Sequence, residues 1–283
     1  MSTFFASTRP GIQVTHGEAI FELPILYFRD DLFALFFTAD PERVRACLPS
    51  DRLHPVMLTS GKAMVGIAAF NYIDTTIGPY GEVGIVLPVV YGTRPPLFFL
   101  PALMEARYPG FGSLVAHLPV TRKVARDAGR GQWGYTKFVA DMHFTICPEF
   151  MECRMSEEGE HILTIRVARR GLVIRDRKPL VTFSVRNGRL IRTTIPQKGA
   201  YRFSLATRGS FLRLGHHPVS ESIRDLDLSA TPLMSRYYVE RSGILPAGEV
   251  IEEGVRSLEG YMGKDREGEH TADYLVKGSG HES

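Results

Sequence analysis

Cysteine is scarce in this chain, and neither sign of charge dominates. Only three cysteines occur among the 283 residues, Cys47, Cys147 and Cys153. Because they form no Cys-x-x-Cys pair and leave one thiol over in any disulfide scheme, we expect a reducing compartment. The 34 basic and 31 acidic side chains give a net charge of +3. The densest basic stretch, residues 166–178, alternates with strand residues, so we expect a solvated strand face and no nucleic-acid partner.

Long apolar runs are also missing. No stretch approaches the ~20 consecutive apolar residues of a membrane-spanning helix. The N-terminal sequence MSTFFASTRPGIQVTHGEA contains no continuous apolar segment of the kind that a secretory signal has. We therefore expect a cytoplasmic protein with no membrane partner.

The common motifs for metals, phosphates and serine nucleophiles are absent as well. His216 and His217 have no further ligands at the spacing of a zinc site. Ser113, in GFGSLVAH, lacks the Gly-x-Ser-x-Gly frame, and the glycines beside it form no phosphate-binding loop. We therefore expect neither a metal nor an organic cofactor.

Strand signals, by contrast, are frequent. The clearest is LVTFSVRNGRLIRTTI, in which residues 180–185 and 190–195 flank Asn187 and Gly188. An Asn-Gly pair supplies the positive φ angles of a tight hairpin, so we expect these two runs to pair antiparallel. Further strands are expected at residues 32–37, 63–72, 83–90, 138–146, 161–167 and 201–207.

Helix signals are few. The sequence Asp-Pro-Glu at residues 40–42 is typical of an N-cap followed by a first turn, and Pro49 should end this helix. A second short helix is expected from a Thr121 cap to Gly129.

Successive strands without regular helical crossovers predict the fold class. We expect a mainly β (α+β) protein whose core is a closed antiparallel β-barrel with a few peripheral helices. A chain of this size often forms one domain, which we place at residues 1–263. The last residues, 264–283, are polar and are expected to form a C-terminal tail.

Lys137 stands in an unusual setting, the largely apolar segment QWGYTKFVADMHF. If Phe138 begins a strand, Lys137 and Tyr135 lean to one face, and Thr136 and Phe138 to the other. An amine attacks a ketone only when it is uncharged, and an ordinary lysine is almost entirely protonated at pH 7. Burial in an apolar pocket disfavours the ammonium form. Lys137 is therefore either a nucleophile or a surface lysine whose amine reaches water along its apolar stem.

Two further charged residues stand beside apolar strands. Glu82, in IDTTIGPYGEVGIVLP, is either a solvated acid or a group that orients a substrate and passes a proton. Arg29, in YFRDDLFALFF, either forms a surface ion pair with Asp30 or Asp31 or grips a carboxylate with its planar fork.

Three motifs in order carry a resemblance to a known family. FRDDLFALFFTADPERVRACLP, GPYGEVGIVLPV and GRGQWGYTKF resemble segments of the acetoacetate decarboxylase family, which carry an arginine, a glutamate and a Schiff-base lysine in this order. By position these residues are Arg29, Glu82 and Lys137. The resemblance covers roughly residues 20–145 at the level of motifs, and it implies a closed β-barrel around the lysine in a homo-oligomer.

The chain departs from the family pattern at two places. Well-known decarboxylases carry a second lysine directly after the nucleophile, whereas this chain has Phe138. The apolar surroundings would then have to disfavour the ammonium without a neighbouring cation. The family also carries a second acid on the strand before the glutamate, and the matching stretch here, MVGIAAF, is uncharged.

The resemblance implies a lyase with a small keto acid as its partner. We expect Lys137 to attack the ketone of acetoacetate or a related β-keto acid and to form an iminium, from which CO2 leaves. Glu82 would assist proton transfer while lying a water or more from Lys137 or being partly protonated, and Arg29 and Tyr135 would contact the substrate. Two alternatives remain open: an aldolase-dehydratase that joins pyruvate to an aldehyde through the same lysine, and a non-catalytic barrel that binds a small ligand.

Overall fold

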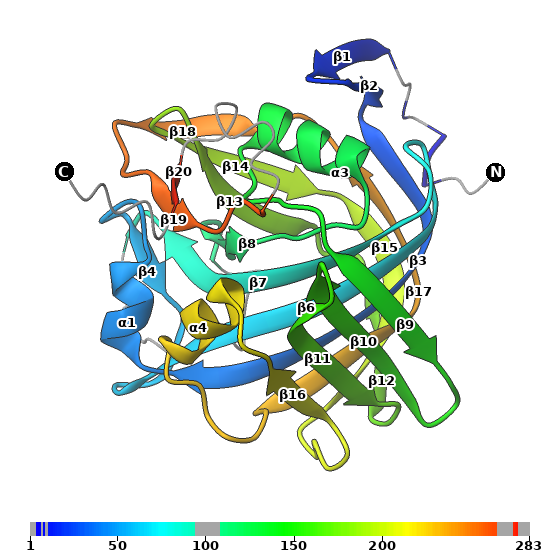
Figure 1. Cartoon of the computed structure of the whole chain (residues 1–283), viewed down its shortest axis with the longest axis vertical. Helices are drawn as coiled ribbons and strands as arrows, with labels where there is room; N and C mark the ends of the chain where they lie inside the picture. Colours follow the sequence, from blue (N-terminus) through cyan, green and yellow to red (C-terminus); the bar gives the residue numbers. More distant parts are fainter. Residues whose placement is uncertain (1–3, 7, 9–10, 94–107, 265–273, 277–283) are drawn as a thin grey trace.

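Antiparallel strands make up most of the computed structural model, as the sequence predicts (Figure 1). The structure describes all residues except 1–3, 7, 9–10, 94–107, 265–273 and 277–283. The main sheet has the strand order β12 (Leu172–Asp176), β15 (Gln197–Ser204), β17 (Met234–Leu245), β3 (Ile25–Ala39), β6 (Lys62–Thr75), β7 (Tyr80–Tyr91), β8 (Phe111–His117), β13 (Leu180–Arg186), β14 (Arg189–Ile195) and β18 (Glu249–Glu253). Two short strands extend it, because β4 (Leu53–Pro55) pairs with β7 and β5 (Met57–Thr59) pairs with β6.

A second sheet lies across the long central strands of the first. Its order is β16 (Phe211–Leu214), β11 (Glu160–Ala168), β10 (Phe150–Glu157) and β9 (Asp141–Ile146). Figure 1 shows this sheet in front of β3, β6 and β7. A core cluster joins the two layers, with Phe33 and Leu35 from β3 meeting Cys153 from β10 and Ile165 from β11. The inner faces of both sheets are therefore buried against each other.

Two small strand pairs complete the described part of the chain. Strand β1 (Ile12–His16) pairs antiparallel with β2 (Ala19–Leu23), and β19 (Leu258–Gly260) pairs parallel with β20 (Tyr274–Val276). Strand β20 falls within the expected C-terminal tail, of which the structure describes only Lys264 and residues 274–276.

The prediction of a closed barrel is wrong. In the described part of the chain, β12 pairs only with β15 and β18 only with β14, so the main sheet has two open ends. One reason lies in the stretch 138–146, which we expected to be a single strand. Its regular strand begins only at Asp141 and joins the second sheet. The result is two layers packed face to face.

The predicted hairpin is confirmed, because β13 and β14 pair antiparallel around Asn187 and Gly188, whose φ angles are 51° and 66°. Helix α1 (Pro41–Ala46) also forms as predicted, and the Asp40 carboxylate accepts hydrogen bonds from the backbone N–H groups of residues 42 and 43. Helix α3 (Lys123–Ala128) begins later than expected. The Thr121 hydroxyl is not its cap, because it accepts a hydrogen bond from Gly81 N on β7.

Helix α4 (Pro218–Arg224) was not predicted, and its N-cap, His217, joins a buried polar cluster. Glu157 accepts hydrogen bonds from Tyr261 Oη at 2.6 Å, from Lys264 N at 3.0 Å and from His217 Nε2 at 3.0 Å. Burial works to raise the pKa of Glu157, but these hydrogen bonds outweigh it and hold the pKa below its ordinary value. Phe138 stacks on the His217 ring, so this cluster supports the residue that follows Lys137.

The lowered pKa of Glu157 predicts a stability difference that depends on pH. Glu157→Gln should lower Tm by about 5 °C at pH 7, because it removes charge-assisted hydrogen bonds. The charge of Glu157 stabilises the fold above its unfolded pKa, and this contribution is lost as pH falls through the lower folded pKa. Thermal unfolding of wild type and variant from pH 7 to pH 3 should therefore show a shrinking gap. A gap that stays constant, or one matched by the exposed control Glu253→Gln, would contradict the role of the charge.

In the described residues, no helix combines the length and apolar character needed to cross a membrane.

Candidate active site

Glu82 and Lys137, which are 55 residues apart in the sequence, meet in a buried ion pair. Lys137 Nζ lies 2.6 Å from Glu82 Oε2. The two side chains expose 6% and 8% of their surface. Of our two alternatives for Glu82, separation by a water or more is therefore wrong, and partial protonation stays a prediction. In this direct contact each charge is compensated by the other, and the carboxylate can accept a proton from the ammonium, which leaves a neutral amine.

Strand alternation on β7 places the glutamate. Tyr80 and Glu82 point to one face of β7, and their neighbours across the strand pair are Tyr72 and Phe70 on β6. Val83 points to the opposite face and joins the core between the two sheets. Glu82 thus lies among aromatic rings, on a face of β7 where an apolar side chain would ordinarily pack.

The segment that carries Lys137 is held beside β7 by backbone hydrogen bonds. Residues 136 and 138 accept bonds from the N–H groups of Leu118 and Val120, and Val120 in turn forms a β-bridge with Glu82. In the segment itself, Lys137 O accepts a hydrogen bond from the buried Arg130 Nε at 2.6 Å. These contacts fix the lysine backbone although it belongs to no regular strand.

A π-helical turn, Gly129–Trp133, precedes this segment and follows α3 directly. It ends at Gly134, whose φ of 69° is left-handed. A β-carbon at Gly134 would lie 2.3 Å from Val185 O, so only glycine fits. π-Helical turns occur often at functional sites, and here the turn redirects the chain so that Lys137 points back toward α3.

Gly129 lies against the stem of Lys137. A β-carbon there would lie 2.5 Å from both Cδ and Cε of the lysine. The φ and ψ of Gly129, −66° and −44°, are helical, so its backbone would accept alanine. The missing side chain at Gly129 therefore provides the space that the lysine stem fills.

Gly129→Ala should displace the Lys137 amine while leaving the fold intact. We expect turnover to fall about 100-fold, because a shift of about 1 Å at a reacting group has an effect of this size. Tm should fall only moderately, because the helix preference of alanine offsets part of the cost of crowding the buried lysine stem. The measurements are turnover, borohydride trapping and thermal unfolding, with Gly61→Ala as control because no atom lies within 4 Å of its added β-carbon. Full activity in Gly129→Ala would show that the close contact is unimportant.

Tyrosines surround the ion pair. Tyr72 Oη donates to Glu82 Oε1 at 3.1 Å, and the hydroxyls of Tyr27 and Tyr80 bond to each other at 3.0 Å. Tyr135 Oη and Thr182 Oγ1 lie 2.8 Å apart. Desolvation by burial raises the pKa of Tyr135 to about 12, and desolvation together with the Glu82 charge raises the pKa of Tyr72 well above its usual value. The hydroxyl groups of these tyrosines therefore stay protonated and act as hydrogen-bond donors.

A small cavity, with a volume of about 10 Å³, opens at the lysine. This is about the space of one water. Lys137 is the only charged residue among the described residues that line it, and Tyr135 is also part of the lining, as predicted from the alternation of side chains. The lining residues are Ile25, Tyr27, Ile77, Tyr80, Ala125, Ala128, Gly129, Trp133, Tyr135, Lys137 and Leu245.

The structure does not bring Arg29 into this cavity. Arg29 is exposed on β3, beside a bulge, and is not among the lining residues. Another arginine, Arg241 on β17, is buried, and its Nη1 lies 2.5 Å from Asp30 Oδ2. Desolvation raises the pKa of Asp30 more than Arg241 lowers it. Sequence reasoning named Asp30 only as a surface partner of Arg29, and nothing local signalled Arg241.

No group of three or more His, Cys, Asp or Glu side chains in the described part of the chain is arranged to hold a metal ion. The chemistry available at this site is that of an amine, a carboxylate and neutral hydroxyls in an aromatic pocket. An amine beside a proton acceptor in such a place can form an imine with a ketone or aldehyde.

Comparisons with known proteins identify the family of the chain. A family model described as acetoacetate decarboxylase (ADC) matches residues 12–252. Among curated proteins, no match was found.

Several solved structures share the fold. An acetoacetate decarboxylase from Legionella pneumophila subsp. pneumophila str. Philadelphia 1 has a TM-score of 0.63 and 18% identity, over 88% of this chain and 94% of that chain. The enduracididine biosynthesis enzyme MppR complexed with pyruvate has a TM-score of 0.58 and 14% identity, over 81% of this chain and 91% of that chain. An acetoacetate decarboxylase-like enzyme from Sphingomonas wittichii RW1 has a TM-score of 0.57 and 15% identity, over 81% and 93% of the two chains. At these identities the likeness concerns the fold alone.

Proposed function

The chain belongs to the acetoacetate decarboxylase family, and from this premise we propose that it is a Schiff-base-forming lyase that decarboxylates acetoacetate or a related short β-keto acid. The observation that carries the proposal is the contact of Lys137 Nζ with Glu82 Oε2 at 2.6 Å inside an aromatic pocket. It supplies both a nucleophile and an acceptor for the proton that the nucleophile must lose.

The reaction begins with transfer of a proton from the Lys137 ammonium to Glu82. The neutral amine attacks the ketone carbon of the substrate, and loss of water gives an iminium. The bond between the α-carbon and the carboxylate then breaks, and its electron pair moves to the iminium. CO2 leaves, and an enamine stays bound to Lys137. Protonation of the enamine carbon and addition of water release the ketone and restore the amine. Glu82 accepts and returns protons in these steps.

The apolar lining favours the bond-breaking step. The iminium and the carboxylate carry opposite charges, whereas the enamine and CO2 carry none. A pocket of low polarity therefore stabilises the transition state relative to the charged intermediate that precedes it. Apart from Lys137 itself, no cationic side chain lies among the described lining residues, so none forms an ion pair with the carboxylate that would stabilise its charged form. The small volume of the cavity favours short substrates, and side chains must shift to admit even these.

A second candidate is an aldolase-dehydratase that joins pyruvate to an aldehyde through the same lysine. The observation that favours it is the set of similar MppR structures, one complexed with pyruvate and another with the condensation product of pyruvate and imidazole 4-carboxaldehyde. The lack of any charged residue besides Lys137 among the described lining residues argues against this candidate, because pyruvate keeps its carboxylate throughout a condensation and that charge would need a partner.

Two assays on the wild-type protein separate the candidates. We expect CO2 release from acetoacetate or another short β-keto acid, and a borohydride-reduced adduct on the peptide that contains Lys137. Condensation of pyruvate with an aldehyde, without CO2 release from any β-keto acid, would favour the second candidate. No reduced adduct with any ketone would leave only a non-catalytic, ligand-binding protein.

A further inference from the structure

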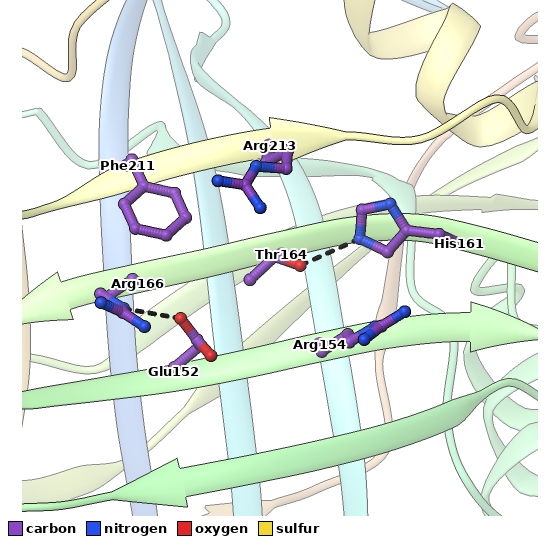
Figure 2. Close-up of a pocket in the computed structure, with 7 residues that line it drawn as sticks. All are labelled: Glu152, Arg154, His161, Thr164, Arg166, Phe211 and Arg213. Carbon is purple, nitrogen blue, oxygen red and sulfur yellow. Dashed lines mark hydrogen bonds and ion pairs between the residues drawn. The ribbon is translucent and has the colours of Figure 1, made fainter.

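The outer face of the second sheet carries a groove that the proposed reaction does not use. Its volume is about 490 Å³, and it is lined by residues from three strands, β10, β11 and β16 (Figure 2). The inner faces of the same strands are buried in the core between the two sheets. Strand alternation therefore directs a separate set of side chains outward into this groove.

The strand register aligns basic residues across the groove. Arg213 on β16 lies opposite Thr164 on β11, which lies opposite Arg154 on β10. On the far side, Arg154 lies opposite His143 on β9. This row contains no acid, whereas a face that serves only solubility usually mixes both signs of charge.

The neighbouring row is different because its charge is already compensated. Arg166 Nε lies 2.6 Å from Glu152 Oε2, and the Arg166 guanidinium lies over the rings of Phe150 and Phe211. Figure 2 shows this pair at one end of the groove. Arg166 is thus fixed and its charge is compensated. Arg213 also lies over the Phe211 ring, at 5.5 Å, but neither Arg213 nor Arg154 has a carboxylate partner among the described residues.

Arg154 and Arg213 have open donors. Within the described residues, neither guanidinium has a carboxylate or carbonyl acceptor, and both side chains are exposed. They are two strands apart, roughly 9.5 Å between backbones, so their long side chains can reach one anion above Thr164. Thr164 is 9% exposed, and its hydroxyl lies 2.9 Å from His161 Nε2. Desolvation, together with the charges of Arg154 and Arg213, lowers the pKa of His161, so the field of both arginines reaches this ring.

We propose that this groove binds the phosphate group of a small phosphorylated molecule between Arg154 and Arg213, with Thr164 and His161 as further hydrogen-bonding partners. A phosphate dianion has several oxygens for two planar guanidinium forks that approach from opposite strands, and it compensates both charges. A monocarboxylate would compensate only one of them. The site is independent of Lys137, so it stands or falls separately from the proposed decarboxylation.

Calorimetric titration of the full-length protein at low ionic strength tests the site, with inorganic phosphate and phenyl phosphate as probes. We expect saturable binding with one site per chain, and about tenfold weaker binding for Arg154→Ala and for Arg213→Ala. Arg154→Lys keeps the charge but loses the fork, and it should also weaken binding. The control is Arg175→Ala, an exposed arginine on β12, which should bind like wild type.

A second readout locates the probe. The ring signals of His161 in NMR spectra should shift on addition of phosphate and should not shift in the Arg154→Ala/Arg213→Ala double variant. The site assignment would be overturned by unsaturable binding, by equal weakening in Arg175→Ala, or by binding that survives the double substitution. Binding of a single-stranded oligonucleotide, but of neither small phosphate, would overturn the small-molecule assignment.

Discussion

Replacing Lys137 with methionine is expected to abolish covalent trapping and to lower turnover about 10⁴-fold or more, the scale on which loss of a covalent nucleophile acts. Methionine keeps an unbranched apolar stem of similar length, so the space beside Gly129 stays filled. The measurements are CO2 release and mass spectrometry of the borohydride-treated protein with acetoacetate. The control is Lys198→Met, an exposed lysine on β15, which should change neither.

The same substitution should also destabilise the protein, because Glu82 would remain buried without its cation. Breaking one side of a buried ion pair costs about 3–5 kcal/mol. The double variant Lys137→Met/Glu82→Gln removes both charges and should recover most of this stability without recovering activity. A single variant that still forms the adduct would overturn the role of Lys137. If the double variant were no more stable than Lys137→Met alone, the unpaired charge of Glu82 would not be the cause of the lost stability.

Local patterns marked the lysine and the glutamate as unusual for their charge but left a surface role open for both, and it was the order of three motifs resembling the acetoacetate decarboxylase family that selected them. Lys137 lies in an apolar run and Glu82 at the start of an apolar strand. The alternation of side chains also places Tyr135 with Lys137 in the pocket and Phe138 in the core between the sheets, although the regular strand begins only at Asp141. The alternation of side chains persists in this irregular segment because successive residues of an extended backbone still point to opposite sides.

The rest of the site depends on contacts between residues that are far apart in the chain. Asp30 pairs with Arg241, which is 211 residues away, and only the register between β3 and β17 brings them together. A β-strand pattern shows which residues share a face but not which strand lies beside it. For this reason the sequence suggested Arg29 as the functional arginine, whereas the structure buries Arg241. The closed barrel failed for the same reason, since no local pattern identifies the strands at the ends of a sheet.

Glu82→Gln is expected to lower turnover about 10²- to 10⁴-fold while the adduct on Lys137 still forms. The amide keeps the shape of the side chain and can still accept the hydrogen bond from Tyr72 Oη. It cannot accept a proton, and proton transfer by a positioned side chain contributes about this factor. The ammonium of Lys137 also loses its counter-charge in a buried site, which favours the neutral amine that attacks the ketone.

Trapping and turnover should therefore separate in this variant, and single-turnover trapping beside steady-state CO2 release measures both. Tyr72→Phe removes the other hydrogen bond to the carboxylate at 3.1 Å and keeps the proton acceptor, so it serves as the matched control with a much smaller loss of turnover. If Glu82 served only to stabilise the fold, Glu82→Gln would lower Tm, and it would lower trapping and turnover to the same extent. If turnover stayed near wild type, the proton would have to pass through another group. The residue to replace next would then be the buried Asp30. Its pKa is raised by desolvation first and then by the nearby carboxylates.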